Sequence, residues 1–320
     1  MSILRKLLGF FLVLGLLGIA NLAWGAGPFS YRLPRGPGLD PEAVTVVGQP
    51  QIHHIVRYEN LYELARKYDL GFWELAHYHW NLDHFYLPWD TDIVIPTQWI
   101  IPERSSYPGY LINIAELRGY RFFPEKSEVR TYPIGIGVLD YESPIGKHLS
   151  VANKSVNPGW HIPPHLQAKY GMSYMPPGED NPVGDRWMGM APGHYGLHGT
   201  CYPQGVGRLV SHGCNRHYPE DIHELFDITP VGTTVEFIYE PVKIGYLHGR
   251  IFIEVHEDMY EKIPDMLQYA TKKIEERGLS RRIDWPKVLK AVAEESGAPL
   301  EITRGSTASA ASAQIRPAAE

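Results

Sequence analysis

The feature that most constrains the fold is a series of short apolar runs, separated by Gly and Pro, that begins at Gly109. The runs are rich in β-branched and aromatic side chains, and each has the length of a single strand. They lie at residues 110–114, 119–123, 128–136 and 235–238. A helix is expected between the last two, near 219–226. This pattern is typical of a mainly β domain, which we place at residues 108–240.

A smaller unit with a strand–helix–helix–strand (βααβ) order is expected at residues 52–97. Asn60 stands where an N-cap is needed, and Glu63 follows three residues later, as in a capping box. A second short helix is expected at 71–76 and a closing strand at 92–96. We expect four aromatic side chains to form the core of this unit, and a sugar-binding platform is the alternative: Tyr78, Trp80, Tyr86 and Trp89.

The segments that flank these two units are simpler. Residues 1–25 combine Arg5 and Lys6 with an apolar run and small residues, which is typical of a cleaved secretory signal peptide. Residues 26–51, rich in Gly and Pro, are expected to form an extended lead-in. Residues 241–302 are expected to form an α/β extension with one hairpin and two helices. The Ala- and Ser-rich residues 303–320 are expected to be disordered.

Charge and cysteine content limit the possible partners and compartment. The formal charge is −6, and it becomes −8 when the two cations Arg5 and Lys6 leave with the signal peptide. A chain this acidic is a poor candidate for binding nucleic acid. Export would bring it into an oxidising compartment, where two cysteines can either form a disulfide or leave one thiol free for chemistry.

Both cysteines lie in one short stretch, residues 194–221, together with several histidines. A cysteine attacks an acyl carbon as a thiolate, and it needs a neighbouring base because its ordinary pKa is about 8.5. We expect a tight turn at Gly213 and Cys214, with the following helix start lowering the pKa of the thiol. Two other interpretations are a Cys201–Cys214 disulfide and a zinc site. The zinc ligands would come from His194, His198, Cys201, His212, Cys214 and His217.

The sequence His198–Gly199–Thr200, followed by Ser211–His212–Gly213–Cys214–Asn215–Arg216, resembles the signature of the L,D-transpeptidases. Three further stretches resemble the LysM-containing periplasmic subgroup of these cell-wall enzymes: YPIGIGVLDYESPIG, NPGWHIPPH and PPGEDNPVG. The resemblance implies a β-sandwich catalytic domain, preceded by a LysM-like module and located in the periplasm. It implies no cofactor and no required metal.

The resemblance also implies roles for individual residues. Cys214 would be the nucleophile and His198 the general base, with its ring oriented by the Gly199 carbonyl. The remaining matched residues would surround the oxyanion and substrate: His212, Gly213, Ser211, Arg216 and Thr200. Cys201 replaces a residue that is often Asn in the family, and it is a candidate redox partner of Cys214. Asn215 and His217 replace residues that are usually apolar, and we expect His217 at the surface.

The implied reaction is a two-step acyl transfer on peptidoglycan stem peptides. Cys214 would attack the carbonyl at the L-centre of diaminopimelate in a tetrapeptide, release D-Ala, and pass the acyl group to an acceptor. The acceptor is left open between a second diaminopimelate (a 3–3 cross-link), a lysine of an outer-membrane lipoprotein, a D-amino acid and water. Two alternatives remain: an amidase that uses water, and a non-catalytic wall-binding protein that holds glycan strands through the LysM-like unit.

Overall fold

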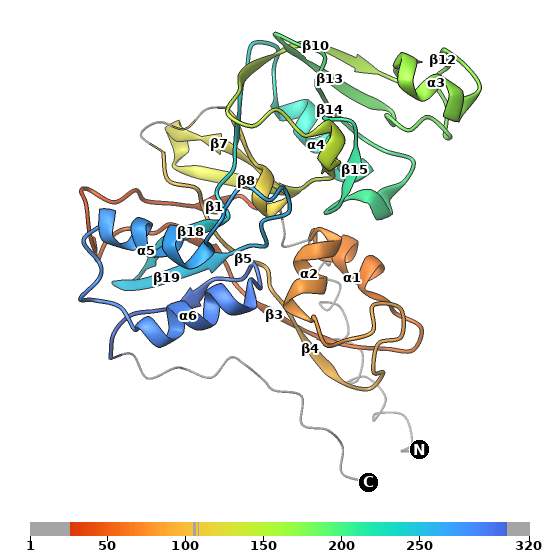
Figure 1. The fold of residues 1–320 in the computed structure, drawn as a ribbon. Coiled ribbons are helices and arrows are strands. Elements are labelled where there is room, and N and C mark those ends of the chain that lie inside the picture. Colours follow the sequence, from red (N-terminus) through yellow and green to blue (C-terminus); the bar gives the residue numbers. More distant parts are fainter. Residues whose placement is uncertain (1–25, 105–106, 108, 306–320) are drawn as a thin grey trace, which may run out of the picture.

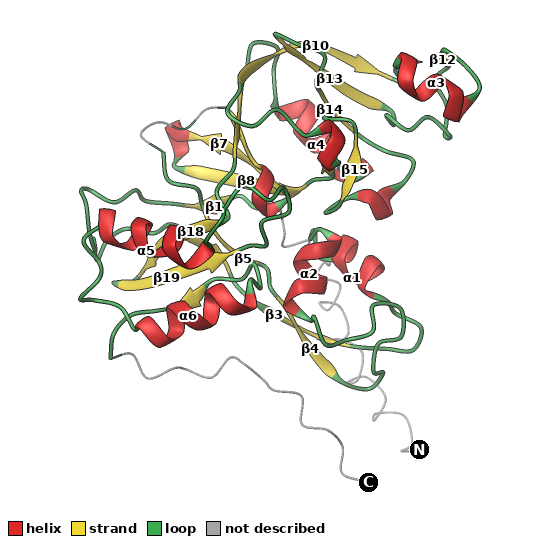
Figure 2. Cartoon of the chain, in the orientation of Figure 1, coloured by secondary structure: helices red, strands yellow, loops and turns green. Residues whose placement is uncertain are grey.

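The computed structural model describes residues 26–104, 107 and 109–305, and strands dominate it (Figures 1 and 2). The signal peptide expected at 1–25 and most of the expected disordered tail, 306–320, lie outside the described residues. Within the described part, no helix is both long and apolar enough to cross a bilayer. The prediction of a mainly β fold is confirmed.

The centre of the molecule is a nine-stranded mixed sheet with the order β1-β8-β7-β6-β17-β10-β13-β14-β16. Its neighbours are antiparallel, except for the parallel pairs β6–β17 and β14–β16. The strands are β1 (Phe29–Ser30), β6 (Tyr110–Asn113), β7 (Arg118–Phe123), β8 (Glu128–Pro133), β10 (His148–Val156), β13 (Arg186–Ala191), β14 (Gly196–His198), β16 (Asn215–Arg216) and β17 (Thr234–Ile238).

The two faces of this sheet pack against different layers, because successive side chains of a strand point to opposite faces. On one face, Tyr110 and Ile112 pack in a core with Ile222 and Leu225 of helix α4 (Pro219–Ile228). On the other face, Leu111 of the same strand belongs to a core that includes the helices of the N-terminal unit. The sheet is therefore covered on both sides at β6.

The N-terminal unit, residues 52–97, has the expected order of elements. They are β3 (Gln51–His54), α1 (Leu61–Lys67), α2 (Phe72–Tyr78) and β4 (Asp92–Ile95), with the two strands antiparallel. Asn60 is the N-cap of α1, and its side chain accepts a hydrogen bond from the Glu63 backbone N–H at 3.0 Å. The assignment of this unit to the LysM family stays a prediction.

The expected aromatic core of this unit is largely wrong. Trp80, Tyr86 and Trp89 are 80%, 83% and 57% exposed, and only Tyr78 is half-buried. The core consists instead of α1 and α2 side chains, such as Leu64 and Leu75, packed on the central sheet. Aromatic content alone does not tell a core from a surface, and these three residues lie in a loop rather than on a periodic helical face.

The lead-in and the C-terminal extension are joined to the rest of the chain. Strand β1 pairs with β8, and β2 (Val46–Gly48) pairs with β5 (Gln98–Ile100). The extension contains β18 (Val242–Leu247), β19 (Arg250–Val255), β20 (Leu300–Glu301), α5 (Met266–Glu276) and α6 (Trp285–Glu294). Ala43 of the lead-in lies in the core of the extension. The ordered extension continues past 302, because Thr303 forms a bridge with Ile283.

The remaining elements are short and lie around the ends of the central strands. They are β9 (Ile136–Gly137), β11 (Trp160–His161), β12 (Tyr174–Met175), β15 (Leu209–Ser211), α3 (Pro164–Tyr170), and the 3-10 helices η1 (Ile114–Glu116), η2 (Pro124–Lys126), η3 (Leu139–Tyr141) and η4 (Pro203–Gly205). Strand β15 runs parallel to β9.

Candidate active site

The edge of the central sheet brings the two parts of the signature together. Strands β14 and β16 are parallel neighbours, and His198 lies opposite Arg216. Cys214 lies two residues before Arg216, and the Arg216 charge acts on both the Cys214 thiol and the His198 ring. The fold thus brings the His198 strand and the segment that carries Cys214 to the same edge of the sheet.

A tight turn carries the thiol. The buried Ser211 hydroxyl donates a hydrogen bond to the backbone carbonyl of Cys214 and closes the turn. Gly213 has a φ of +99°, a conformation that L side chains rarely adopt, and a Cβ there would lie 3.0 Å from the Tyr195 ring. Both the hydroxyl and the glycine are therefore required by the geometry of the turn.

The Cys214 thiol is protonated at neutral pH in this structure. Its Sγ lies 4.0 Å from the His194 backbone carbonyl, which accepts from it. Burial raises the pKa of the thiol to about 11, although a hydrogen bond from the Gly196 backbone N–H and the Arg216 charge act in the opposite direction. The expected lowering of the pKa by a helix start is wrong, because strand β16 separates Cys214 from α4.

His198 is buried and fixed in one tautomer. Its Nδ1 lies 2.6 Å from the Gly199 carbonyl oxygen, which can only accept, so Nδ1 carries the proton and Nε2 keeps a lone pair. Burial and the Arg216 charge lower the pKa of His198 to about 3. The Trp187 ring stacks against the imidazole at a centroid distance of 5.6 Å. The ring is therefore a neutral, oriented proton acceptor.

Arg216 is a cation without a carboxylate partner among the described residues, and its buried Nε has no hydrogen-bond partner there.

The side chains of Thr200 and Cys201, the two residues after Gly199, make hydrogen bonds to backbone groups. The Thr200 hydroxyl accepts from the Tyr202 backbone N–H at 2.9 Å, and the Cys201 Sγ donates to the Asp180 carbonyl at 3.5 Å. Both cysteines are free thiols in this structure, so no disulfide joins Cys201 to Cys214.

His212 is exposed and belongs to a cluster of three rings. Its centroid lies 4.6 Å from that of Tyr141 and 5.1 Å from that of His165, and the last two rings stack at 4.8 Å. The sequence analysis did not select Tyr141 or His165 as site residues. A signal was present, since both lie in stretches quoted for the family resemblance.

Asn215 and His217, the two polar residues that replace usually apolar residues of the family, are both buried. His217 is fully buried and its Nε2 lies 3.0 Å from the Tyr110 hydroxyl, so the expected surface position is wrong. His217 directly follows β16, and its backbone N–H donates to the His198 carbonyl, so the hydrogen bonding between the two strands continues past β16 into the core. The Asn215 side chain is also fully buried, and neither its Oδ1 nor its Nδ2 has a hydrogen-bond partner within the described residues.

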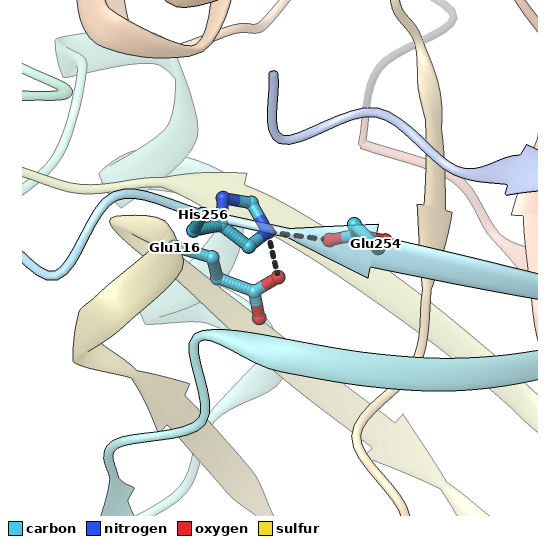
Figure 3. Close-up of side chains that lie close together, drawn as sticks. All are labelled: Glu116, Glu254 and His256. Carbon is cyan, nitrogen blue, oxygen red and sulfur yellow. Dashed lines mark hydrogen bonds and ion pairs between the residues drawn. The ribbon is translucent and has the colours of Figure 1, made fainter. Parts of the chain in front are cut away.

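The candidate zinc ligands of the sequence analysis do not converge. In the part of the chain that the structure describes, the one group of ligating side chains close enough to hold a metal is Glu116, Glu254 and His256 (Figure 3). This group contains neither cysteine and none of the signature residues, and the Lys243 ammonium already contacts both carboxylates. The cluster is therefore a buried ion-pair network that joins β18, β19 and η1.

Comparisons with known proteins give the family of the domain that carries this site. Residues 108–244 match YkuD, the L,D-transpeptidase catalytic domain. In Escherichia coli (strain K12), the probable L,D-transpeptidase YcfS is 34% identical over 241 residues, covering 71% of this chain and 74% of that protein. The probable L,D-transpeptidase ErfK/SrfK of the same strain is 30% identical over 285 residues, covering 84% of this chain and 91% of that protein. The probable L,D-transpeptidase YbiS, again of that strain, is 34% identical over 245 residues, covering 73% and 77%.

Among solved structures, the catalytic domain of the E. faecium L,D-transpeptidase is 19% identical, covers 42% of this chain and 100% of that domain, and has a TM-score of 0.33. The family assignment therefore rests on the sequence relatives, which extend over most of the chain. On that basis, this chain belongs to the L,D-transpeptidase family.

Proposed function

We propose that this protein is a cysteine-dependent L,D-transpeptidase of the periplasm that acts on peptidoglycan stem peptides, with Cys214 as the nucleophile. One observation carries the proposal. The β14–β16 pairing brings the Cys214 segment beside the His198 strand, the Arg216 charge acts on both side chains, and the Gly199 carbonyl holds the His198 ring so that Nε2 has the free lone pair. A thiol and an oriented, neutral imidazole at one site are the groups that nucleophilic acyl transfer needs.

The pKa values of the two groups define how the thiol is activated. Burial raises the pKa of Cys214 to about 11 and lowers that of His198 to about 3, so both are neutral at rest. The proton then leaves Sγ for Nε2 as the carbon–sulfur bond forms, rather than beforehand. The imidazolium returns this proton to the amine of the departing D-Ala, and a thioester remains on Cys214. The backbone N–H groups of Gly213 and Cys214, with His212, surround the developing oxyanion.

The unpaired guanidinium of Arg216 supports the proposal that the substrate carries carboxylate groups. The guanidinium lies beside the thiol without a protein anion to neutralise it, which is costly unless a ligand provides one. A diaminopimelate-containing tetrapeptide offers such groups near the bond that is cleaved. The thioester then passes to an amine of a second stem peptide or of a lipoprotein lysine, or to water, which hydrolyses the thioester and releases the tripeptide. The enzyme acts as an amidase if the acyl group comes instead from a diaminopimelate–lysine bond and water is the acceptor.

The experiment is product analysis with the reduced enzyme. Disaccharide-tetrapeptide is incubated alone, with a D-amino acid, and with a lysine-ended peptide, and products are separated by mass. Cross-linked dimer, exchanged peptide, lysine adduct or free tripeptide each identify the acceptor. Cys214→Ser should abolish every product, and Cys201→Ser should not. Turnover that survives in Cys214→Ser would remove the basis of the proposal.

A second function, wall binding, is supported by the exposed aromatic loop of the N-terminal unit. Trp80, Tyr86 and Trp89 lie between α2 and β4, and exposed apolar groups of this size mark interaction sites when they cluster. Aromatic faces suit the apolar faces of sugar rings. Trp80→Ala combined with Tyr86→Ala should reduce co-sedimentation with purified sacculi, and Leu289→Ala, on the exposed face of α6, should not. If all variants bind sacculi equally, this loop is excluded as the wall-binding site.

A further inference from the structure

The N-terminal unit and the catalytic sheet form one folded body. Leu64 and Leu75, from helices α1 and α2, share a hydrophobic core with Leu111, Tyr120 and Phe122 of the sheet. Figure 1 shows these two helices, in orange, beside the catalytic strands. The N-terminal unit is therefore structurally continuous with the catalytic sheet.

The start of helix α2 is held by the catalytic domain. The backbone N–H groups of Phe72 and Trp73 donate to the carbonyls of Val206 and Gly207, both at 3.3 Å. These carbonyls satisfy N–H groups that a helix leaves free at its first turn. The two backbones touch closely, because a Cβ built on Gly71 would lie 2.7 Å from the Gly207 Cα. Neither glycine leaves space for a side chain.

Side chains reinforce this contact from both partners. Glu74 of α2 accepts two hydrogen bonds from the fully buried Arg118 of β7, at 2.9 and 2.8 Å. From the catalytic side, the Arg208 guanidinium lies over the rings of Phe72 and Tyr62, at 5.5 and 5.9 Å from their centroids. Arg208, the residue that follows Gly207, therefore also packs against the N-terminal unit.

A short, hydrogen-bonded strand leads from this contact to the nucleophile. Gly207 donates to the Ile134 carbonyl, and Val138 donates to the Ser211 carbonyl, so β15 is held at both of its ends. Ser211, the last residue of β15, closes the Cys214 turn through its hydroxyl. Only residues 208–213 separate the Gly207 contact with α2 from Cys214.

We infer that Gly71 and Gly207 are positioning residues for the reaction. Close docking of helix α2 onto Gly207 sets the register of β15 and, through Ser211, the position of the Cys214 thiol. The N-terminal unit is then part of the catalytic apparatus, in addition to any affinity for cell wall. The catalytic part of this inference rests on the proposed function, whereas the effect on the thiol itself does not.

Gly71→Ala tests the inference cleanly. The φ of Gly71 is −74°, so alanine adds no backbone strain, and the atoms nearest to its Cβ belong to the Gly207 backbone and the Glu74 carboxylate. Gly36→Ala is the matched control, because no atom lies within 4 Å of the added Cβ. A displacement of about 1 Å can cost up to about a hundredfold in rate. We expect kcat of Gly71→Ala to fall at least about tenfold with little change in KM.

Thiol alkylation by iodoacetamide gives a second readout within the same molecule. Displacement of β15 should expose Cys214 and speed its alkylation several-fold, as measured by peptide mass. Cys201, which contacts Asp180 on another segment, should react at an unchanged rate. Unfolding would accelerate both cysteines, so their ratio separates repositioning from loss of fold.

Arg208→Gln covers the case in which Gly71→Ala does not fold, since it removes the ring contacts without adding an atom to the backbone contact. It should change the Cys214 to Cys201 ratio in the same direction, by a smaller factor. The inference is overturned if the variants that fold match wild type and Gly36→Ala in this ratio. If wild type itself forms no acyl product, the proposed function fails, and the alkylation ratio still decides the positioning role.

Discussion

Replacing Asp69 by Asn should stabilise the protein at neutral and alkaline pH. Asp69 follows helix α1, and its buried carboxyl group lies within hydrogen-bonding reach of the buried carboxyl group of Asp221 on α4. Neither oxygen of Asp69 has a donor among the described residues. The nearby Arg118 donates instead to Glu74, Thr131 and the Asp69 backbone carbonyl. A buried carboxyl group without donors that faces a second buried carboxyl group needs a proton shared between the two.

The magnitude follows from the pKa of Asp69, which burial raises from 3.8 to about 7. A folded-state pKa above the unfolded value means that the folded protein binds more protons, so wild-type stability falls as pH rises from about 4 to about 7. Three pKa units correspond to about 4 kcal/mol at most. An amide in place of the carboxylate donates to Asp221 without a proton from solvent. Asn also suits the φ of +54° at this position.

The assay is urea unfolding of wild type and Asp69→Asn between pH 4.5 and pH 8, with Asp227→Asn, at an exposed position, as the control. The free energies of unfolding of wild type and Asp69→Asn should nearly coincide at pH 4.5. At pH 8 the variant should be more stable by about 2–4 kcal/mol. A pH-independent difference, or a variant less stable than wild type at pH 8, would refute the shared-proton reasoning.

Three further predictions concern single residues. Alkylation of Cys214 should accelerate with pH beyond pH 9, in line with the pKa of about 11; a plateau below pH 8 would show that the thiolate already exists. Asn215→Val should raise the free energy of unfolding by about 1–3 kcal/mol, because it removes two buried polar atoms without partners; a lower melting temperature would contradict this. Lys243→Met should cost about 3–5 kcal/mol, since Glu116 and Glu254 then lie buried without their cation. EDTA should leave the wild-type melting temperature unchanged, whereas a drop would indicate a metal at that cluster.

The strands and helices were largely predictable because their signals are local. Asn60 caps α1 as expected, and the hairpin of the extension turns at His248 and Gly249, both with positive φ. Long-range pairing was not visible in the sequence. The lead-in strand β2 pairs with β5, and Ala43 enters the core of the extension. Such contacts depend on which surfaces meet, and no local pattern encodes that.

The candidate site shows the same division between local and distant information. The signature predicted that His198 and Cys214 belong together, and the β14–β16 pairing brings the segments that carry them to one edge of the sheet. The ionisation state of the thiol was beyond reach, because it depends on burial beneath groups that are distant in sequence. The docking of Gly71 on Gly207 escaped prediction for the same reason, since each glycine alone resembles an ordinary turn residue.

The central claim is that Cys214 forms the acyl-enzyme, and trapping that intermediate tests it most directly. Reduced protein would be mixed with disaccharide-tetrapeptide, quenched in acid within seconds, and measured by intact and peptide mass. The account predicts a disaccharide-tripeptide acyl group on Cys214, with one D-Ala released per adduct, and no adduct in Cys214→Ala. An adduct on Cys201, or D-Ala release from the Cys214→Ala enzyme, would contradict it.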